Sequence, residues 1–549
     1  MVIRGGRLFQ QFIVDMYVKI ENTRLDFLRL NQDTIRADLY QGILDTLELG
    51  ESSTCNVGKR IVLPPSFLGG PRDMRRRYLN AIALVQKYGK LDLFITITCN
   101  PNWAEIKDEL GPGEKAQDKP DILARIFHAK LTLLRKQIRE KKVFGEVAAM
   151  INVVEYQKRG LPHAHFLIIL KPGYKITSPE KFDKYVFAEI PSTENPHLRA
   201  AVIWHMMHGP CGDAFLKCAC MQTKNRKREC SKVYPKKFRA FTTNGRDSYP
   251  LYRLRDTGEK IVVRKGELDN RSMVPYNSYL LAMFDYHLNV EVCSTINAVK
   301  GHQPQQGHDR VLFNVESGGV APLVDDIHRY QSGRWVSPPE AAWRIFGFNL
   351  FDVYPPVQLL PVHSPNNQLI RFAANEELAT IAADEHRTKT MLTEFFNTNA
   401  KLPEGENYLC SEFPEHFVWV DKKKCWKRRD SGIVIGRVAH ASPGEGERYY
   451  LRLFLAHVRS PKYFEDIKTV NGVCCASYQE AALKRGILEQ DNEAEKCMDE
   501  AVNVEMPNAL RRLFATILIF SCPNNPAILG SILLGPFRGF CKTIPRQRC

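Results

Sequence analysis

The spacing of apolar side chains divides this chain into three regions. From Leu8 to about Leu47 they recur at helical spacing, which predicts a helical module over residues 1–60. From about Ile61 to Val315 alternating and helical spacings succeed one another, which predicts an α+β domain over residues 61–315. Residues 321–549 combine short strands with helical stretches at Asn367–Asn397 and Ser477–Phe520, so we expect a mixed region there.

Two apolar strands frame the most informative segment. The apolar stretch Val147–Val154 leads through Glu155 and a polar turn into His163-Ala164-His165, which continues as the apolar stretch Phe166–Leu170. Because side chains alternate along a strand, both imidazoles should lie on one face and can share a divalent metal ion. Glu155 could add an oxygen ligand from the neighbouring strand. The alternative is a pair of histidines that only flank a turn.

A second strand points to the same chemistry. Leu93–Trp103 alternates in polarity, ends in a polar turn, and precedes a helical stretch at Asp121–Lys141. The order strand, helix, strand, His-x-His strand resembles the first two motifs of rolling-circle replication initiators. The chain is more similar still to the N-terminal helicase-like region of Helitron transposases, in segments Gly5–Tyr40, Lys59–Lys87, Phe94–Ile106, Phe144–Leu170 and Asp325–Phe348.

The resemblance implies a fold, a metal and a substrate. The fold would be a five-stranded antiparallel sheet of the His-x-His replication-initiator type with helices. His163, His165 and Glu155 would bind Mg²⁺ or Mn²⁺, although imidazole ligands also tolerate zinc. In that family a tyrosine attacks a phosphate of single-stranded DNA, which nicks the strand and transfers it. The resemblance thus implies a nuclear protein of rolling-circle transposition.

Another enzyme class with alternating histidines, the histidine-triad nucleotide hydrolases, fits the sequence less well. Such a hydrolase would need a further histidine at the position of Leu167.

Two parts of the family pattern are missing. The tyrosine helix should follow the strand Asn289–Cys293, but after Lys300 the chain passes directly to Gly301, and no tyrosine occurs from His287 to Arg329. A deletion and an error in the gene model would both explain this gap. No Gly-x-x-x-x-Gly-Lys-Ser/Thr segment occurs, so we expect no ATP site and no helicase in this chain. Nicking is therefore expected to be impaired, and the alternative is a catalytically dead remnant that only binds single-stranded DNA.

Cysteines and histidines gather within residues 205–237. The chain has 15 cysteines and its start does not read as a signal peptide, which favours thiols or metal ligands over disulfides. A structural zinc ion needs four soft ligands, and the best set is His208, Cys211, Cys220 and Cys230, with His205 and Cys218 as substitutes. A loop with free thiols is the alternative.

The charge of the chain suggests an anionic partner. The formal net charge is +16, which suits nucleic acid or an acidic membrane surface. The apolar stretch Phe514–Phe537 contains Pro523 and Pro526, so we expect no membrane span. Basic runs are also typical of solvated surfaces. The candidate DNA contacts are Thr96, Thr98, Asn100, Arg75, Arg76 and Arg77.

Overall fold

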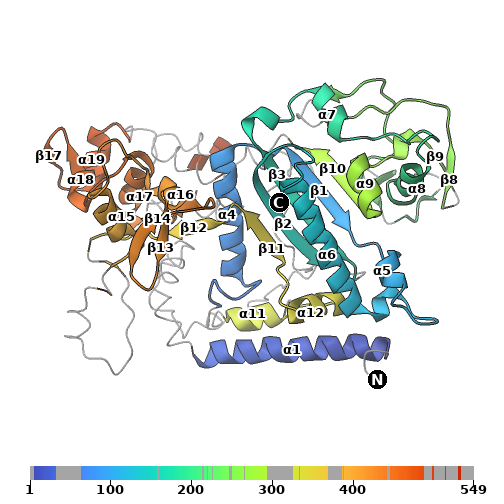
Figure 1. Cartoon of the computed structure of the whole chain (residues 1–549), viewed down its shortest axis with the longest axis horizontal. Helices are drawn as coiled ribbons and strands as arrows, with labels where there is room; N and C mark the ends of the chain where they lie inside the picture. Colours follow the sequence, from blue (N-terminus) through green and yellow to red (C-terminus); the bar gives the residue numbers. More distant parts are fainter. Residues whose placement is uncertain are drawn as a thin grey trace, which may run out of the picture.

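Five antiparallel strands form the central sheet (Figure 1). Their order is β10 (His287–Val292), β1 (Leu93–Thr98), β3 (Pro162–Leu170), β2 (Val147–Tyr156) and β11 (Phe351–Tyr354). The expected antiparallel sheet in an α+β arrangement is confirmed, whereas its assignment to the replication-initiator type stays a prediction.

The computed structural model describes most of the chain. It covers residues 5–31, 63–156, 160–293, 325–365 and 389–487, with short gaps at 213–214, 219, 225–226, 246–249, 265, 333 and 442–444, and a few isolated residues elsewhere. Lys300 and the segment expected to carry the tyrosine helix lie outside the described residues, as do most of residues 32–60 and 488–549.

One face of the sheet is covered by apolar helix surfaces. Helix α6 (Pro120–Arg139) starts with a proline in its first turn and turns Leu123, Phe127 and Leu131 inward, at the spacing of one helix face. These side chains share a core with Ile95 and Phe166 of the sheet. The helical stretch expected at Asp121–Lys141 is therefore confirmed. Two further helices join this core, α9 (Ser278–Phe284) and α12 (Pro338–Ile345).

The opposite face carries one long helix on its apolar part. Helix α4 (Pro71–Tyr88) packs Tyr78 and Ile82 against Ile151 and Leu167 in a second core. Strand β11 also contributes to this core, through the partly buried Phe351. The sheet thus takes an edge strand from residues that the sequence placed in the C-terminal region, because the alternation of a four-residue strand gives no clue to its partner. The division into domains itself stays a prediction.

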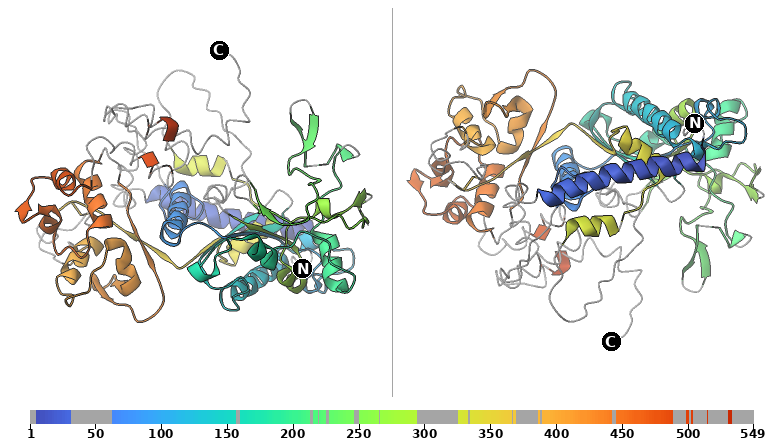
Figure 2. Two further views of the ribbon diagram at one scale, coloured as in Figure 1. Left: turned by 90° about the horizontal axis from the view of Figure 1, so that it is seen from above. Right: turned by 90° about the horizontal axis from the view of Figure 1, so that it is seen from below.

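Helix α1 (Arg7–Leu30) lies alongside α11 (Asp326–Ser332) and α12 (Figure 2). Its buried residues, Phe9, Ile13, Tyr17, Glu21 and Leu25, follow one face of the helix. The carboxylate of Glu21 accepts hydrogen bonds from Tyr17 at 2.5 Å and from Tyr330 at 2.9 Å. The N-terminal helix is therefore fastened to residues about three hundred positions away.

An insertion between β3 and β10 is rich in short elements. It contains helices α7 (Pro179–Tyr185) and α8 (Pro196–His205) and the hairpins β4–β5 (Met221–Lys224 and Lys227–Cys230), β6–β7 (Thr243–Asn244 and Pro250–Leu251) and β8–β9 (Ile261–Val263 and Gly266–Leu268).

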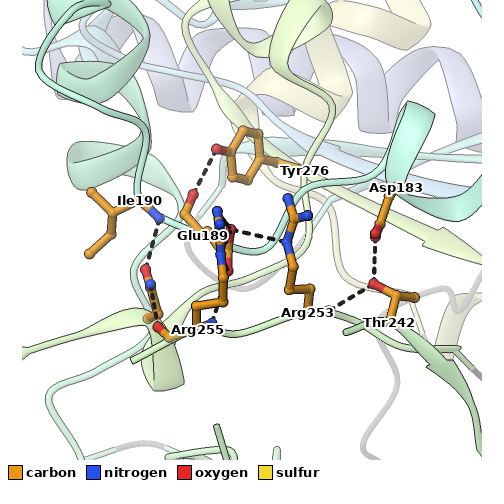
Figure 3. Close-up of polar contacts among 8 residues, drawn as sticks. Asp183, Glu189, Ile190, Thr242, Arg253, Arg255 and Tyr276 are labelled. Carbon is orange, nitrogen blue, oxygen red and sulfur yellow. Dashed lines mark hydrogen bonds and ion pairs between the residues drawn. The ribbon is translucent and has the colours of Figure 1, made fainter. Parts of the chain in front are cut away.

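A polar network holds this insertion together (Figure 3). Glu189 accepts hydrogen bonds from the backbone of Arg255 at 2.8 Å and from the guanidinium groups of Arg255 and Arg253. The backbone carbonyl of Glu189 accepts a hydrogen bond from Tyr276 at 2.8 Å. Burial opposes ionisation of Glu189, but its bonds to the arginines outweigh burial and lower its pKa.

Residues beyond the central sheet form a second lobe with its own core (Figure 1). Strand β12 (Val357–Leu360) pairs in parallel with β15 (Ile435–Val438), and β13 (Phe417–Val420) pairs with β14 (Cys425–Arg428). Strands β16 (Thr469–Val470) and β17 (Val473–Cys474) form a short hairpin. The helices of this lobe are α15 (Met391–Asn399), α16 (Phe413–His416), α17 (Glu447–His457), α18 (Phe464–Lys468) and α19 (Tyr478–Lys484). Within the described residues, no helix combines the length and the apolarity needed to cross a membrane.

Candidate functional site

The half of the sheet face that α4 leaves uncovered is polar. Antiparallel pairing puts His287, Thr98, His163 and Glu155 in one row across four strands. The next row along the strands contains Asn289, Thr96, His165 and Val153. Directly paired residues point to the same side of a sheet, so the two histidines of the His-x-His segment and Glu155 share one face. The expected placement of these three residues is confirmed.

The side chain of His165 has defined neighbours on this face. Its Nδ1 atom lies 3.0 Å from the hydroxyl oxygen of Thr96, and its Nε2 atom lies 3.5 Å from a carboxylate oxygen of Glu155. The ring of Phe94 stacks on the imidazole with 5.7 Å between ring centroids. Both His165 and Glu155 are largely buried, with side chains 17% and 20% exposed. The ring orientation is therefore set by groups on two neighbouring strands.

His163 has a different environment. Its Nδ1 atom is buried, and no hydrogen-bond partner for that atom occurs among the described residues. Burial lowers the pKa of His163, and the electrostatic effect of the nearby His165 imidazole acts in the same direction. A neutral imidazole has a lone pair to offer, which is the state that metal ligation requires.

These residues have the chemistry of a divalent-cation site but not the closed geometry of one. Among the described residues, the ligand atoms of the Cys/His cluster in the insertion lie close enough together to hold a metal ion. The ligand atoms of His163, His165 and Glu155 do not meet the same criterion. The Nδ1 atom of His165 is occupied by Thr96 and its Nε2 atom faces Glu155. The assignment of a metal to these three residues stays a prediction.

Strand β10 adds polar groups that the sequence analysis did not single out. His287, Asn289 and Glu291 alternate along the strand, and β10 pairs with β1 on the side away from β3. His287 lies opposite Thr98, and burial, with the nearby His163, lowers its pKa to about 4. The alternation of His287, Asn289 and Glu291 was a visible signal, but only the register of the sheet brings this strand to the site.

The DNA-contact candidates fall into three groups: two threonines, Asn100 and a basic run. Thr96 and Thr98 lie half-buried on the polar face. Asn100 is buried, donates to the backbone carbonyl of Asp285 at 2.7 Å, and accepts from the backbone of Asn102, so it holds a turn in shape.

The basic run lies on α4. Asp73 pairs with Arg76 at 2.7 Å and with Arg77 at 2.8 Å. Arg77 is buried and its guanidinium lies over the ring of Phe351, while Arg75 is half-buried. Arg77 therefore supports packing of the helix on the sheet, whereas Arg76, with 45% of its side chain exposed, could also meet a solvent-borne phosphate.

The tyrosines closest in sequence to the missing motif lie on the other side of the sheet. Tyr286 is buried in the core beside Trp103, and burial raises its pKa well above the usual value. Tyr279 donates to Gln137 of α6 at 3.1 Å, and Tyr276 donates to Glu189. None of these three hydroxyls belongs to the polar face.

The predicted soft-ligand set comes together in the insertion. The ligand atoms of His208, Cys211, Cys220 and Cys230 all lie within 4.8 Å of one another, and they could hold a metal ion. The two substitutes have other partners: Cys218 donates to the carbonyl of Pro210 at 2.9 Å, and His205 pairs with Asp285 at 2.9 Å. The choice of four ligands from six is therefore supported by their geometry.

Comparison with known proteins gives one family. Residues 1–168 match the family model described as the Helitron helicase-like domain at the N-terminus. That range ends within β3 and includes β1, Glu155 and both histidines of the His-x-His segment. No curated protein matches the chain significantly.

Proposed function

Because residues 1–168 make this chain a Helitron-related protein, we propose that its polar sheet face binds single-stranded DNA together with a divalent cation. The observation that carries the proposal is the row of His163 and Glu155 beside His165, all on the polar part of one sheet face. A DNA-processing protein of this family would act in the nucleus.

The cation would be Mg²⁺ or Mn²⁺ held by His163, His165 and Glu155. Two imidazoles and a carboxylate suit a first-row divalent ion and leave positions open for oxygen atoms of a phosphate. A bound cation supplies charge that polarises the phosphodiester and orients it. Thr96 fixes the His165 ring through its hydroxyl, so the ligand requires little reorganisation.

DNA would be held by groups around this face rather than by a deep cleft. Lysine and arginine side chains bind DNA phosphates whatever the base sequence, and their contribution to affinity weakens as the salt concentration rises. The net charge of +16 suits such binding. Aromatic side chains near the face could stack on unpaired bases.

We do not expect this chain to cleave DNA through a tyrosine. No tyrosine occurs from His287 to Arg329. On the far side of the sheet, Tyr279 bonds to Gln137 and Tyr286 is buried in the core. A covalent step needs a phenolate aligned with a cation-bound phosphate. These observations favour the second candidate, a remnant that binds single-stranded DNA without cleaving it through a tyrosine.

The experiment combines binding with an adduct assay. Labelled single-stranded oligonucleotides are incubated with the full chain and Mn²⁺ over a series of salt concentrations, and a denaturing gel reports covalent adducts. We expect salt-sensitive binding and no tyrosine-linked adduct. Binding that does not change with salt, or equal binding by an H163A/H165A variant, would contradict a DNA site on this face. An adduct at a peptide containing Tyr279 or Tyr286 would overturn the view that cleavage is lost.

The Cys/His cluster would hold a different ion. Three thiolates and one imidazole complete a tetrahedral shell, which is the ligand set of structural zinc and leaves no position for a substrate. We therefore assign zinc to the cluster and Mg²⁺ or Mn²⁺ to the sheet face.

A further inference from the structure

The hairpin β4–β5 has almost no apolar contacts of its own. Its register pairs Met221 with Cys230, and the remaining pairs are Gln222 with Glu229, Thr223 with Arg228 and Lys224 with Lys227. Met221 and Cys230 are buried, while the described side chains farther along the hairpin are exposed. An isolated two-stranded hairpin is marginally stable in water, so something other than a core must fix this one.

The Cys/His cluster lies at the base of that hairpin and joins it to the end of α8. Cys220 precedes β4 and Cys230 ends β5, whereas His208 and Cys211 follow α8. The Sγ atom of Cys230 lies 3.3 Å from Nε2 of His208. Ligands at zinc distances in a tetrahedron are about 3.5 Å apart, so only a small contraction of the other pairs is needed.

The backbone that follows Cys230 is bonded to its sulfur. Backbone N–H groups of Tyr234 and Lys232 donate hydrogen bonds to the Sγ atom of Cys230. Donation of backbone N–H groups to a sulfur also fixes the turn that follows the hairpin. Such outer-shell hydrogen bonds orient metal ligands.

The turn after the hairpin connects the cluster to the sheet. The ring of Tyr234 stacks on His208 with 4.2 Å between centroids, and its hydroxyl donates to the carbonyl of Met273 at 3.2 Å. Lys236 donates its backbone N–H to Arg271 at 2.9 Å. Residues 271–273, which accept these bonds, lead into Pro275, whose carbonyl accepts a hydrogen bond from the backbone N–H of Val290 in β10 at 3.0 Å.

This chain of contacts ends beside the polar face. Glu291 lies on that face of β10, near enough for its carboxylate to interact electrostatically with Tyr234 and Lys236. The Nζ atom of Lys236 lies 5.0 Å from the centre of the Tyr234 ring. An aromatic ring and a cation are thus held together at the edge of the sheet by a segment whose other anchor is the Cys/His cluster.

We infer that a zinc ion bound by His208, Cys211, Cys220 and Cys230 fastens the β4–β5 hairpin to the end of α8 and so holds Tyr234 and Lys236 against the β10 edge. The zinc ion acts as a structural link, because all four of its coordination positions are filled by protein. This inference goes beyond the proposed function and does not depend on DNA binding. Its ligand is a divalent cation of the zinc class, bound by this insertion alone.

The test uses the full chain and a matched pair of cysteine variants. C220S and C230S each remove one ligand, whereas C218S removes a thiol of the same loop that bonds to Pro210 instead. Zinc content is measured by elemental analysis, and hydrogen exchange reports residues 215–240. We expect about one zinc per chain in the wild type and in C218S, and a clear loss in C220S and C230S.

Zinc removal from the wild type avoids the risk that a variant misfolds. A high-affinity chelator should speed hydrogen exchange at Tyr234–Lys236 by at least about tenfold and lower the melting temperature by roughly 5 °C, and added zinc should restore both. The inference is overturned if C220S and C230S retain the zinc content of C218S. It is also overturned if chelation removes the zinc and leaves exchange at Tyr234–Lys236 unchanged.

Discussion

Replacing Glu21 by alanine tests how α1 is joined to the rest of the molecule. The Glu21 carboxylate is 8% exposed and accepts hydrogen bonds from Tyr17 and Tyr330. It also lies 3.4 Å from the guanidinium of Arg334, which has a second partner in Glu340 at 3.0 Å. The E21A variant therefore leaves two buried hydroxyls without their acceptor, while Arg334 keeps one carboxylate.

The size of the effect follows from these partners. Each buried hydroxyl left without an acceptor costs about 1–3 kcal/mol, and breaking a buried ion pair outright costs about 3–5 kcal/mol. Because Arg334 stays paired, we expect E21A to lower the free energy of unfolding by roughly 3–4 kcal/mol. E21Q keeps an acceptor for the hydroxyls, so its loss should be about half as large.

Urea unfolding followed by tryptophan fluorescence measures this difference. D26A is the matched control, since Asp26 lies on the same helix with 64% of its side chain exposed and pairs with Arg29 only at 4.0 Å. It should change the free energy of unfolding by less than about 1 kcal/mol. Equal unfolding curves for E21A and D26A would refute the claim that this buried network fastens the helix.

Three further substitutions separate roles that the structure assigns. E189Q should destabilise the insertion by roughly 1–3 kcal/mol at neutral pH, because Arg253 and Arg255 lose a charged acceptor. Because the pKa of Glu189 is lowered in the folded state, its contribution to stability is fully present above the unfolded pKa of about 4.3 and is lost as pH falls through the lower folded pKa. The stabilities of wild type and E189Q should therefore converge in acid, and a difference that does not change with pH would contradict this. T96V removes the hydroxyl that fixes His165 and should weaken Mn²⁺ binding by about 10–100-fold in a titration, with no change expected in urea unfolding beyond about 1 kcal/mol. R77A should lower the free energy of unfolding by about 2–3 kcal/mol, because Asp73 loses its buried partner and keeps the half-exposed Arg76, and because the contact with Phe351 is lost. R76A should cost less than about 1 kcal/mol, and equal losses for the two variants in unfolding experiments would count against the buried role of Arg77.

Much of the fold could be predicted from local patterns in the sequence. The alternation in Leu93–Thr98, the apolar run Val147–Val154 and the helical spacing within Pro120–Arg139 are each patterns of a single element, so they could be predicted from neighbouring residues. The shared face of His163 and His165 follows from the period of a strand alone. A helical module is predicted over residues 1–60, and α1 accounts for Arg7–Leu30, while most of residues 32–60 lie outside the described residues.

Features that depend on long-range pairing could not be predicted in this way. Strand β11 joins the sheet through Phe351 and Val353, which pair with Val153 and Ile151 across about two hundred residues, and no local pattern encodes that register. His287 reaches the polar face for the same reason. The structural roles of Asn100 and Arg77 could not be predicted from the sequence either. A polar residue at a strand end, or a basic residue on a helix, has the same local sequence pattern whether its partner is protein or DNA.

The cysteine cluster shows an intermediate case. Residue type suggested six ligands, of which four were the most plausible set for a tetrahedral zinc ion. The hairpin register and the turn after α8 bring His208, Cys211, Cys220 and Cys230 together, while Cys218 bonds to a backbone carbonyl instead. Ligand chemistry could therefore be predicted, but the geometry required the fold.

The central claim is that the polar sheet face binds a divalent cation through His163, His165 and Glu155, and Mn²⁺ titration tests it most directly. Electron paramagnetic resonance counts free Mn²⁺ in the presence of zinc-loaded full chain, so that the Cys/His cluster does not compete. The account predicts one Mn²⁺ site in the wild type, its loss in H163A/H165A, and its retention in H128A, whose imidazole stacks on Phe348. Equal Mn²⁺ affinity in the wild type and in H163A/H165A would contradict the claim.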